Sequence, residues 1–364
     1  MGTKSMQAAV GADLAQDSLL SVRSLKTQFP VDQGLVKAVD GASFEIRRGS
    51  TLCVVGESGC GKSVTARSIL QIVDRPGRVV GGEMLFRRRL RNGSALTGEE
   101  EIVDLAKLDP KGAEIRDIRG RDIAMIFQEP MTSLSPVHTI GDQIVEAVHV
   151  HENLSKAEAK DRAVDVLQRV GVPKPKQRFD SYPFQLSGGL RQRAMIAMAL
   201  VCNPVLLIAD EPTTALDVTT QAQILELMHE LQADYGMAIM FITHDLGVVA
   251  EMADDVVVMY LGLAVERGDV RSIFHNPQHP YTRALLRSIP KLGLGARTGP
   301  RTRLDTIRGM VPDPYNRPAG CPFHNRCDEF MPGTCDRIVP PPIQFGDRRE
   351  VRCLLHGGAE EDTR

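Results

Sequence analysis

The sequence predicts an α/β fold built on a parallel β-sheet. Three short runs are apolar almost throughout, which is typical of strands that are buried on both faces of a sheet. These runs are TLCVV at 51–55, VLLIA at 205–209 and AIMFIT at 238–243. A helical run at 221–236 separates the last two. Strands that alternate with helices in this way indicate a parallel sheet with helices on both faces.

The first half of the chain supplies further strands. Apolar residues recur with period two at 19–29 and 35–46, which predicts two strands, and a helix is expected at 62–73. Between about Pro76 and Arg121 we expect one short strand, MLF, and a charged loop. This region also holds a basic stretch of four residues, Arg87, Arg88, Arg89 and Arg91. Residues 123–127, IAMIF, are another candidate for a buried strand.

The second half begins with helices and ends in a segment of different character. Helical spacing runs from 140 to 170 and resumes at 188–200. Residues 256–268 predict a closing hairpin. After about Arg271 prolines become frequent and the periodicity fades, so we expect a loop-rich extension there.

Length and composition exclude several classes of protein. At 364 residues the chain is long enough for about two domains, and 42% hydrophobic with 25% charged residues is ordinary for a globular protein. The net charge of −2 argues against electrostatic binding of nucleic acid by the whole chain. The sequence has no uninterrupted apolar stretch of about 18–20 residues and no secretory signal, so we expect a cytosolic chain that begins with a disordered tail at 1–17.

A glycine-rich segment after the first buried strand predicts a phosphate-binding site. The pattern G-x-x-x-x-G-K-[ST] is matched by Gly56, Glu57, Ser58, Gly59, Cys60, Gly61, Lys62 and Ser63. Glycines let the backbone approach the phosphates, and the N–H groups at the helix start attract their negative charge. We expect Lys62 to reach the β- and γ-phosphates and Ser63 to bind Mg²⁺. The alternative is a chance glycine-rich turn, but the preceding strand and following helix argue against it.

Two carboxylates follow the apolar run at 205–209. Asp210 stands at the carboxyl end of this strand, where it can hold Mg²⁺ through water. Glu211 is next to it and can polarise the attacking water as a general base. A lone Asp-Glu pair is more often a solvated turn, so this interpretation depends on the phosphate loop.

Further motifs resemble those of ATP-binding cassette (ABC) proteins. The signature motif of that family is matched by Leu186, Ser187, Gly188, Gly189 and Leu190. The usual fifth residue of the motif is Gln. The oligopeptide/dipeptide importer branch commonly has an apolar residue there, so Leu190 favours that branch of the family. In the same order as in the family, Gln128 resembles the Q-loop, Thr214-Ala215-Leu216-Asp217 the D-loop and His244 the switch histidine.

This resemblance implies a domain organisation. Residues 18–270 would form the ABC nucleotide-binding domain, with a RecA-like P-loop core, an antiparallel β subdomain and a helical subdomain at about 130–200. Residues 271–364 would form a small loop-rich C-terminal extension of the oligopeptide/dipeptide type.

The resemblance also implies roles for single residues. Ser187 and the glycine amides of the signature would face ATP held by a partner subunit, with Asp217 beside that shared site. Gln128 would contact Mg²⁺ and the attacking water, and His244 would stabilise the γ-phosphate and orient Glu211. Phe29 would stack on adenine, although a core phenylalanine is the alternative.

Four cysteines crowd the C-terminal end of the chain. Cys321, Cys327, Cys335 and Cys353 resemble the C-terminal signature of the same importer branch, whose cysteines look suited to a [4Fe–4S] cluster. Thiolates suit iron–sulfur or zinc, but structural zinc usually prefers C-x₂₋₄-C pairs, which are absent here. Zinc and free thiols stay open as alternatives. Cys53, Cys60 and Cys202 are expected to be buried, reduced thiols.

The expected function is therefore that of an ATP-hydrolysing subunit of an importer for peptides or similar small solutes. The resemblance implies ATP and Mg²⁺ as ligands, two transmembrane permease subunits, a second ATPase subunit that is either a different chain or a copy, and indirectly a solute-binding protein. It implies a peripheral location on the cytoplasmic face of the cell membrane and no nucleic-acid partner. The alternatives are a soluble cassette ATPase that acts on ribosomes or DNA and a regulatory protein that holds ATP without hydrolysing it.

Overall fold

The computed structural model describes residues 14–92, 95–128, 133–214, 216–289, 306–346 and 348–357. Its main sheet has the strand order β11-β12-β10-β9-β3-β8-β7-β6, and β9, β3, β8, β7 and β6 pair in parallel. The predicted α/β class is therefore confirmed. The strands are β3 (Thr51–Val55), β6 (Ile123–Ile126), β7 (Leu206–Asp210), β8 (Ala238–Ile242), β9 (Asp255–Tyr260), β10 (Leu263–Asp269), β11 (Ile343–Gln344) and β12 (Glu350–Val351).

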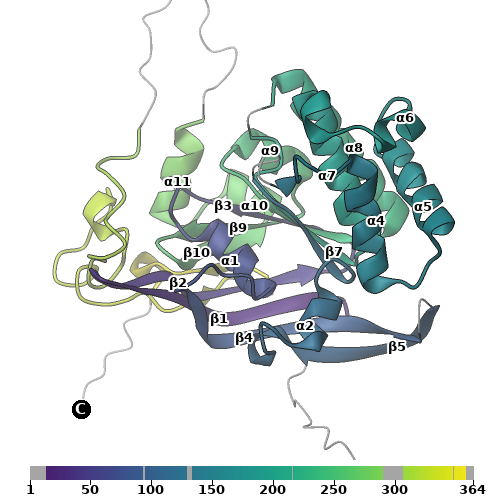
Figure 1. Ribbon diagram of the computed structural model, residues 1–364. Coiled ribbons are helices and arrows are strands. Elements are labelled where there is room, and N and C mark those ends of the chain that lie inside the picture. Colours follow the sequence, from purple (N-terminus) through teal and green to yellow (C-terminus); the bar gives the residue numbers. More distant parts are fainter. Residues whose placement is uncertain are drawn as a thin grey trace, which may run out of the picture.

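A second, antiparallel sheet lies below the main sheet in Figure 1. Its strand order is β2-β1-β4-β5, and the predicted strands of the N-terminal region belong to it. The strands are β1 (Ser18–Val31), β2 (Gly34–Arg47), β4 (Arg78–Asn92) and β5 (Ala95–Asp104). This sheet and helix α1 cover one face of the main sheet.

The helices gather mostly on the other face. Figure 1 shows α4, α5 and α6 as a group to one side of the main sheet, beside α7 and α8. The helices are α1 (Lys62–Ile69), α2 (Ala113–Ile118), α4 (Ile140–His151), α5 (Lys156–Arg169), α6 (Pro175–Phe179), α7 (Gly188–Leu200), α8 (Val218–Tyr235), α9 (Leu246–Met252), α10 (Val270–His275) and α11 (Pro280–Arg287). Short 3₁₀ turns stand at Leu105–Lys107, Pro183–Gln185, His324–Arg326 and Leu354–His356. Within the described ranges, none of the helices has the length and apolarity to cross a membrane.

The main sheet separates two hydrophobic cores. In β3, Cys53 and Val55 pack into the core of the helical side, whereas Leu52 and Val54 pack into the core shared with the antiparallel sheet. Successive side chains of a strand point to opposite faces, so a strand buried on both faces must be apolar throughout. This is the physical reason for the run TLCVV.

The expectation of a charged loop after the basic stretch is wrong. The charged residues 99–101 belong to β5, which pairs with the basic residues of β4. Arg88 lies opposite Glu101, and their charged groups are 3.8 Å apart. Opposite charges on facing strands attract one another, so a segment without apolar alternation still forms a strand.

The C-terminal extension is joined to the main sheet. Strand β12 pairs with β10, with Glu266 opposite Val351. Arg349 forms an ion pair of 3.0 Å with the fully buried carboxylate of Glu266. A second ion pair, between Arg317 and Asp40, ties the extension to β2 at 2.6 Å. The extension thus packs on the cassette rather than standing apart from it.

Arg88 provides a test of the contact between the antiparallel sheet and α2. Its side chain is only 14% exposed and forms ion pairs with Asp117 and Asp122. Arg88→Met should lower the free energy of unfolding by about 2–3 kcal/mol, because loss of one member of a buried ion pair leaves charge poorly compensated. Urea denaturation measures this change. Arg89→Met is the matched control, since Arg89 is the next residue and is exposed; equal losses in both variants would contradict the role of Arg88.

Candidate functional site

The phosphate loop connects β3 to α1 and approaches neighbouring backbone closely. Gly56 and Gly61 both have positive φ, 148° and 99°. A Cβ on Gly56 would lie 2.2 Å from the carbonyl oxygen of Met259, and one on Gly61 would lie 2.3 Å from that of Ala38. Only glycine fits at these two positions, so the loop can lie directly against the backbone of β9 and β2.

Lys62 and Ser63 begin α1 and point to different partners. The ammonium of Lys62 donates to the carbonyl oxygens of Gly56 (2.8 Å) and Glu57 (3.2 Å), so it lies across the loop. The hydroxyl of Ser63 donates to Oδ1 of Asp210 at 3.0 Å. Asp210 ends β7 and is 2% exposed, and this burial raises the pKa of its carboxyl although the Ser63 hydrogen bond opposes the shift.

Three side chains contact one oxygen of the Glu211 carboxylate. Its Oε2 accepts from Nε2 of Gln128 at 3.2 Å and from the hydroxyl of Thr214 at 3.0 Å. Nδ1 of His244 lies 3.4 Å from the same oxygen. The structure thus brings together three residues that the sequence analysis chose separately, Gln128, Glu211 and His244.

Two local features fix Glu211 at this place. Its φ is 47°, a left-handed conformation that is uncommon outside glycine, and its N–H donates to the carbonyl of Ile242 in β8 at 3.0 Å. Thr214 was not predicted as its partner. The available signal was that Thr214 follows Glu211 by three residues, which is the spacing of a turn. In this turn the N–H of Thr214 donates to the Glu211 carbonyl, and the Thr214 side chain comes back to the Glu211 carboxylate.

The signature segment lies on the surface at the start of α7. Leu186 is buried, whereas Ser187 and Gly188 are exposed and Ser187 is the N-cap residue of the helix. The Ser187 side chain makes no capping hydrogen bond, so its hydroxyl is available to a ligand. Gly189 and Leu190 complete the first turn, where a Cβ on Gly189 would lie 2.9 Å from Thr220.

Asp217 and Phe29 occupy positions with local structural contacts. Asp217 caps α8 and accepts from the N–H (3.0 Å) and hydroxyl (2.7 Å) of Thr220, and these bonds lower the pKa of its carboxyl. Phe29 lies half-buried in β1, with its ring against Gly77. Ala215, which belongs to the predicted D-loop motif, lies outside the described residues.

The four C-terminal cysteines line one small cavity. Cys321, Cys327, Cys335 and Cys353 surround it, together with apolar residues such as Phe323 and with His279, His324 and Glu329. All four are free, and burial raises the pKa of the Cys321 thiol to about 12 and that of Cys327 to about 11. Within the described ranges, no three or more His, Cys, Asp or Glu side chains are placed to hold a single metal ion. The four cysteines thus line the same cavity, but the described residues form no metal site there. Cys53, Cys60 and Cys202 are buried and form no disulfide, as predicted.

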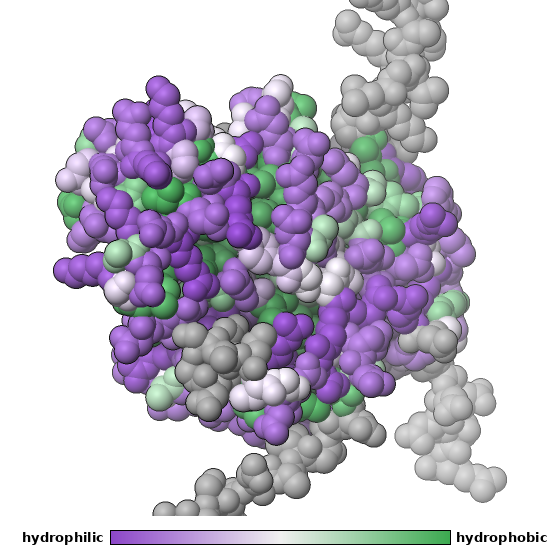
Figure 2. Space-filling view, turned by 90° about the vertical axis from the view of Figure 1, so that its right-hand side faces the viewer, coloured by the Kyte–Doolittle hydropathy of each residue, from purple (hydrophilic) through white to green (hydrophobic). Residues whose placement is uncertain are grey.

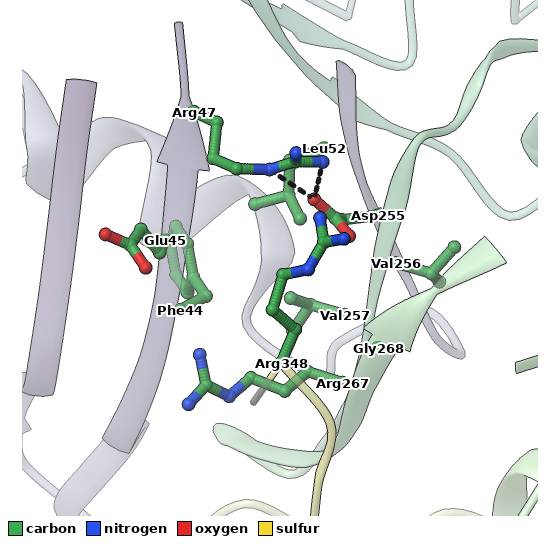
Figure 3. Close-up of a pocket in the computed structure, with 10 residues that line it drawn as sticks. All are labelled: Phe44, Glu45, Arg47, Leu52, Asp255, Val256, Val257, Arg267, Gly268 and Arg348. Atoms are coloured by element: carbon green, nitrogen blue, oxygen red, sulfur yellow. Dashed lines mark hydrogen bonds and ion pairs between the residues drawn. The ribbon is translucent and has the colours of Figure 1, made fainter. Parts of the chain in front are cut away.

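A larger cavity lies away from the phosphate loop. It has a volume of about 100 Å³ and lies between β2, β9 and β10, with Arg348 of the extension at its edge (Figure 3). Arg47 and Asp255 form an ion pair of 2.7 Å across it. Its lining contains no residue of the phosphate loop.

The helical group carries exposed apolar side chains. Phe184 is 64% exposed and stacks on Tyr182 with a centroid distance of 5.5 Å, while Val150 of α4 is 68% exposed. Figure 2 shows the side of the molecule on the right of Figure 1, where apolar patches interrupt a mostly hydrophilic surface. Such patches are typical of surfaces that bind another protein.

Comparison with known proteins assigns the class. The ABC transporter family model matches residues 39–214, and the model of the oligopeptide/dipeptide transporter C-terminal region matches residues 265–335. The dimeric ABC transporter cassette MJ0796 is a structural neighbour with a TM-score of 0.58, 24% identity and coverage of 70% of this chain and 99% of its own. The cassette cbiO1 from Clostridium perfringens has a TM-score of 0.57, 26% identity and coverage of 72% and 92%. The chain is an ABC-type ATPase.

Curated relatives place it within that class. The dipeptide transport ATP-binding protein DppD of Bacillus subtilis is 46% identical over 340 residues, which cover 93% of this chain and 95% of the relative. DppD of Escherichia coli is 45% identical and covers 92% and 96%. The chain belongs to the ATP-binding proteins of the oligopeptide/dipeptide family of ABC transporters.

The glycines of the phosphate loop give a matched pair of variants. Gly59 and Gly61 both have left-handed φ, but a Cβ on Gly59 has nothing within 4 Å. Gly59→Ala should therefore cost about 1 kcal/mol of stability from backbone strain. Gly61→Ala should cost about 3 kcal/mol, because its Cβ would also collide with the Ala38 carbonyl. Thermal unfolding of both variants measures the difference, and equal costs would show that the loop is not held against β2.

Proposed function

We propose that this ATPase drives the import of peptides or related small solutes through separate membrane subunits. The observation that carries the proposal is the Glu211 carboxylate, on which Gln128, Thr214 and His244 converge beside the Ser63–Asp210 pair. A general base, its orienting groups and a magnesium site are the parts that ATP hydrolysis needs. The relatives named for dipeptide transport support an importer over a cassette that acts on ribosomes or DNA.

The residues of the site act on different parts of ATP. The loop amides and Lys62 would bind the phosphates, while Ser63, Asp210 and Gln128 would hold Mg²⁺. Glu211 activates the attacking water, and His244 orients Glu211 and contacts the γ-phosphate. Phe29 stacks on adenine. Its ring is half-buried and lies against Gly77.

The signature acts on ATP that is held by a second ATPase subunit. Ser187 and Gly188 are exposed at the N-terminus of α7, where N–H donors and the helix dipole favour an anion. Asp217 in the D-loop lies beside this shared site. One chain then carries two half-sites, the phosphate loop for its own ATP and the signature for the ATP of its partner. Hydrolysis therefore needs a dimer. The second subunit is either another chain of the same family or a copy of this one.

The exposed apolar side chains of the helical group support docking to a permease. Phe184, Val150 and Val137 stand on this subdomain, which spans about residues 130–200 of the cassette at 18–270. Two transmembrane permeases hold the ATPases at the cytoplasmic face of the membrane, and a solute-binding protein delivers the solute. Affinity purification from gently solubilised membranes tests this arrangement: two polytopic proteins and a second cassette should co-purify, whereas recovery with ribosomal or DNA-repair proteins would contradict it.

The cysteine-lined cavity of the extension (residues 271–364) would hold a [4Fe–4S] cluster. Four thiols line one cavity, which suits a cluster bound by four thiolates, and the sequence spacing lacks the close pairs that zinc prefers. When bound, the cluster would pin together segments of the extension that have little core of their own.

Glu211→Gln tests the assignment of the base. The amide keeps the size of the side chain but cannot accept a proton, so the variant should bind ATP normally and lose at least about 100-fold in turnover. Steady-state hydrolysis by the assembled transporter, with a separate ATP-binding assay, separates the two effects. The control is Glu226→Gln on the exposed side of α8. Unchanged hydrolysis by Glu211→Gln would disprove the role.

Iron analysis tests the cluster. Protein purified without oxygen should contain about four iron and four acid-labile sulfide atoms per chain. Cys327→Ser should lower this content sharply, because one thiolate ligand is lost, whereas Cys202→Ala should leave it unchanged, since Cys202 is buried elsewhere in the core. Zinc in place of iron, or neither metal in the anaerobic protein, would overturn the proposal.

A further inference from the structure

The C-terminal extension reaches into the phosphate loop through Arg326. This residue lies in the 3₁₀ turn His324–Arg326 and forms a two-pronged ion pair with Glu57, the second residue of the loop. Nη1 donates to Oε2 at 2.6 Å and Nη2 donates to Oε1 at 2.9 Å. The two residues are 269 positions apart in the chain. Such parallel hydrogen bonds fix both the distance and the orientation of a carboxylate.

The guanidinium of Arg326 is itself held rigidly. Its side chain is 4% exposed, its Nε donates to the carbonyl of Arg308 at 2.8 Å, and Nη1 donates to the hydroxyl of Tyr260 at 3.3 Å. It also lies 5.8 Å and 5.9 Å from the ring centroids of Tyr260 and Phe323. A buried cation with this many contacts cannot follow a moving loop, so it constrains the loop instead.

A second segment of the extension holds the backbone of Glu57. The hydroxyl of Tyr281, in α11, accepts the N–H of Glu57 at 2.9 Å, and Tyr281 is fully buried against Tyr260 and Phe323. The carbonyl oxygen of Glu57 accepts a hydrogen bond from the ammonium of Lys62 at 3.2 Å. Glu57 is thus held through its side chain and its N–H by the extension, next to the lysine of the phosphate site.

The ion pair between Arg326 and Glu57 also affects the charge of the phosphate loop. Glu57 places a carboxylate in a loop whose ligand carries several negative charges, and without a partner it would repel that ligand. Arg326 compensates this charge and shapes the loop at the same time.

We infer that Arg326 is a positioning residue of the ATP site, which makes the C-terminal extension part of that site. The inference rests on the proposed function, since it concerns the same phosphate loop. Arg326 acts through Glu57: it keeps the loop in its binding conformation before ATP arrives and removes a repulsive charge. Tyr281 supports the same position through the backbone.

The test is equilibrium binding of Mg-ATP to the full chain, with thermal unfolding measured in parallel. Arg326→Ala should raise the Kd for ATP at least about 10-fold, because the loop is loosened and Glu57 is left without its counter-charge. In the assembled transporter the KM for ATP should rise by a similar factor, with a much smaller change in kcat. Arg326→Lys keeps the charge without the two-pronged geometry and should recover part of the affinity.

The matched control is Arg317→Ala. Arg317 also joins the extension to the cassette, through its 2.6 Å ion pair with Asp40 of β2, but its partner is outside the phosphate loop. This variant should lower the melting temperature with little effect on Kd. An equal rise in Kd for Arg317→Ala would show a general docking effect and overturn the inference, as would an unchanged Kd for Arg326→Ala.

Rescue distinguishes positioning from simple loss of structure. Adding Glu57→Gln to Arg326→Ala removes the uncompensated carboxylate and should restore part of the lost affinity; no recovery would contradict the charge argument. If Arg326→Ala does not fold, Tyr281→Phe decides the matter, because it removes one hydroxyl and should raise Kd about threefold. Wild-type protein that fails to bind ATP would instead refute the proposed function itself.

Discussion

The parallel pairing of β6, β7, β8 and β3 is the constraint on which the nucleotide site depends. The carboxyl ends of parallel strands meet at one edge of a sheet, where ligands of open α/β folds bind. Gln128 follows β6, Asp210 ends β7 and Glu211 follows it, His244 follows β8, and the phosphate loop follows β3. Without this register, the Ser63–Asp210 and Gln128–Glu211 contacts would not form.

The site is built from tight backbone packing and from buried charge. Gly56 and Gly61 leave no room for a side chain, so the loop is defined by the carbonyls of β9 and β2 that stand against it. Asp210 is almost fully buried and has a raised pKa, which is a cost that a bound cation would offset. The ion pair of Glu57 with Arg326 adds a buried charge pair at the outer side of the same loop.

Local patterns predicted most of the strands and failed where long-range charge decides the structure. The apolar run at 51–55 and the hairpin at 256–268 form as expected, because burial on both faces or turn chemistry is visible in consecutive residues. Strand β5 was missed since its support is the facing arginines of β4. The short strands β11 and β12 were missed because two residues carry no periodic signal, and their pairing with β10 comes from the fold.

The sequence by itself determined the class of protein, the phosphate loop and the identity of the carboxylates. Their chemistry requires residue types at fixed spacing, and spacing is a property of the chain. Tertiary structure alone decided that Thr214 joins Glu211, that four cysteines share one cavity, and that Arg326 holds Glu57. These contacts depend on where separate elements meet in space. No local pattern records that Arg326 in the extension is the partner of a phosphate-loop residue 269 positions earlier.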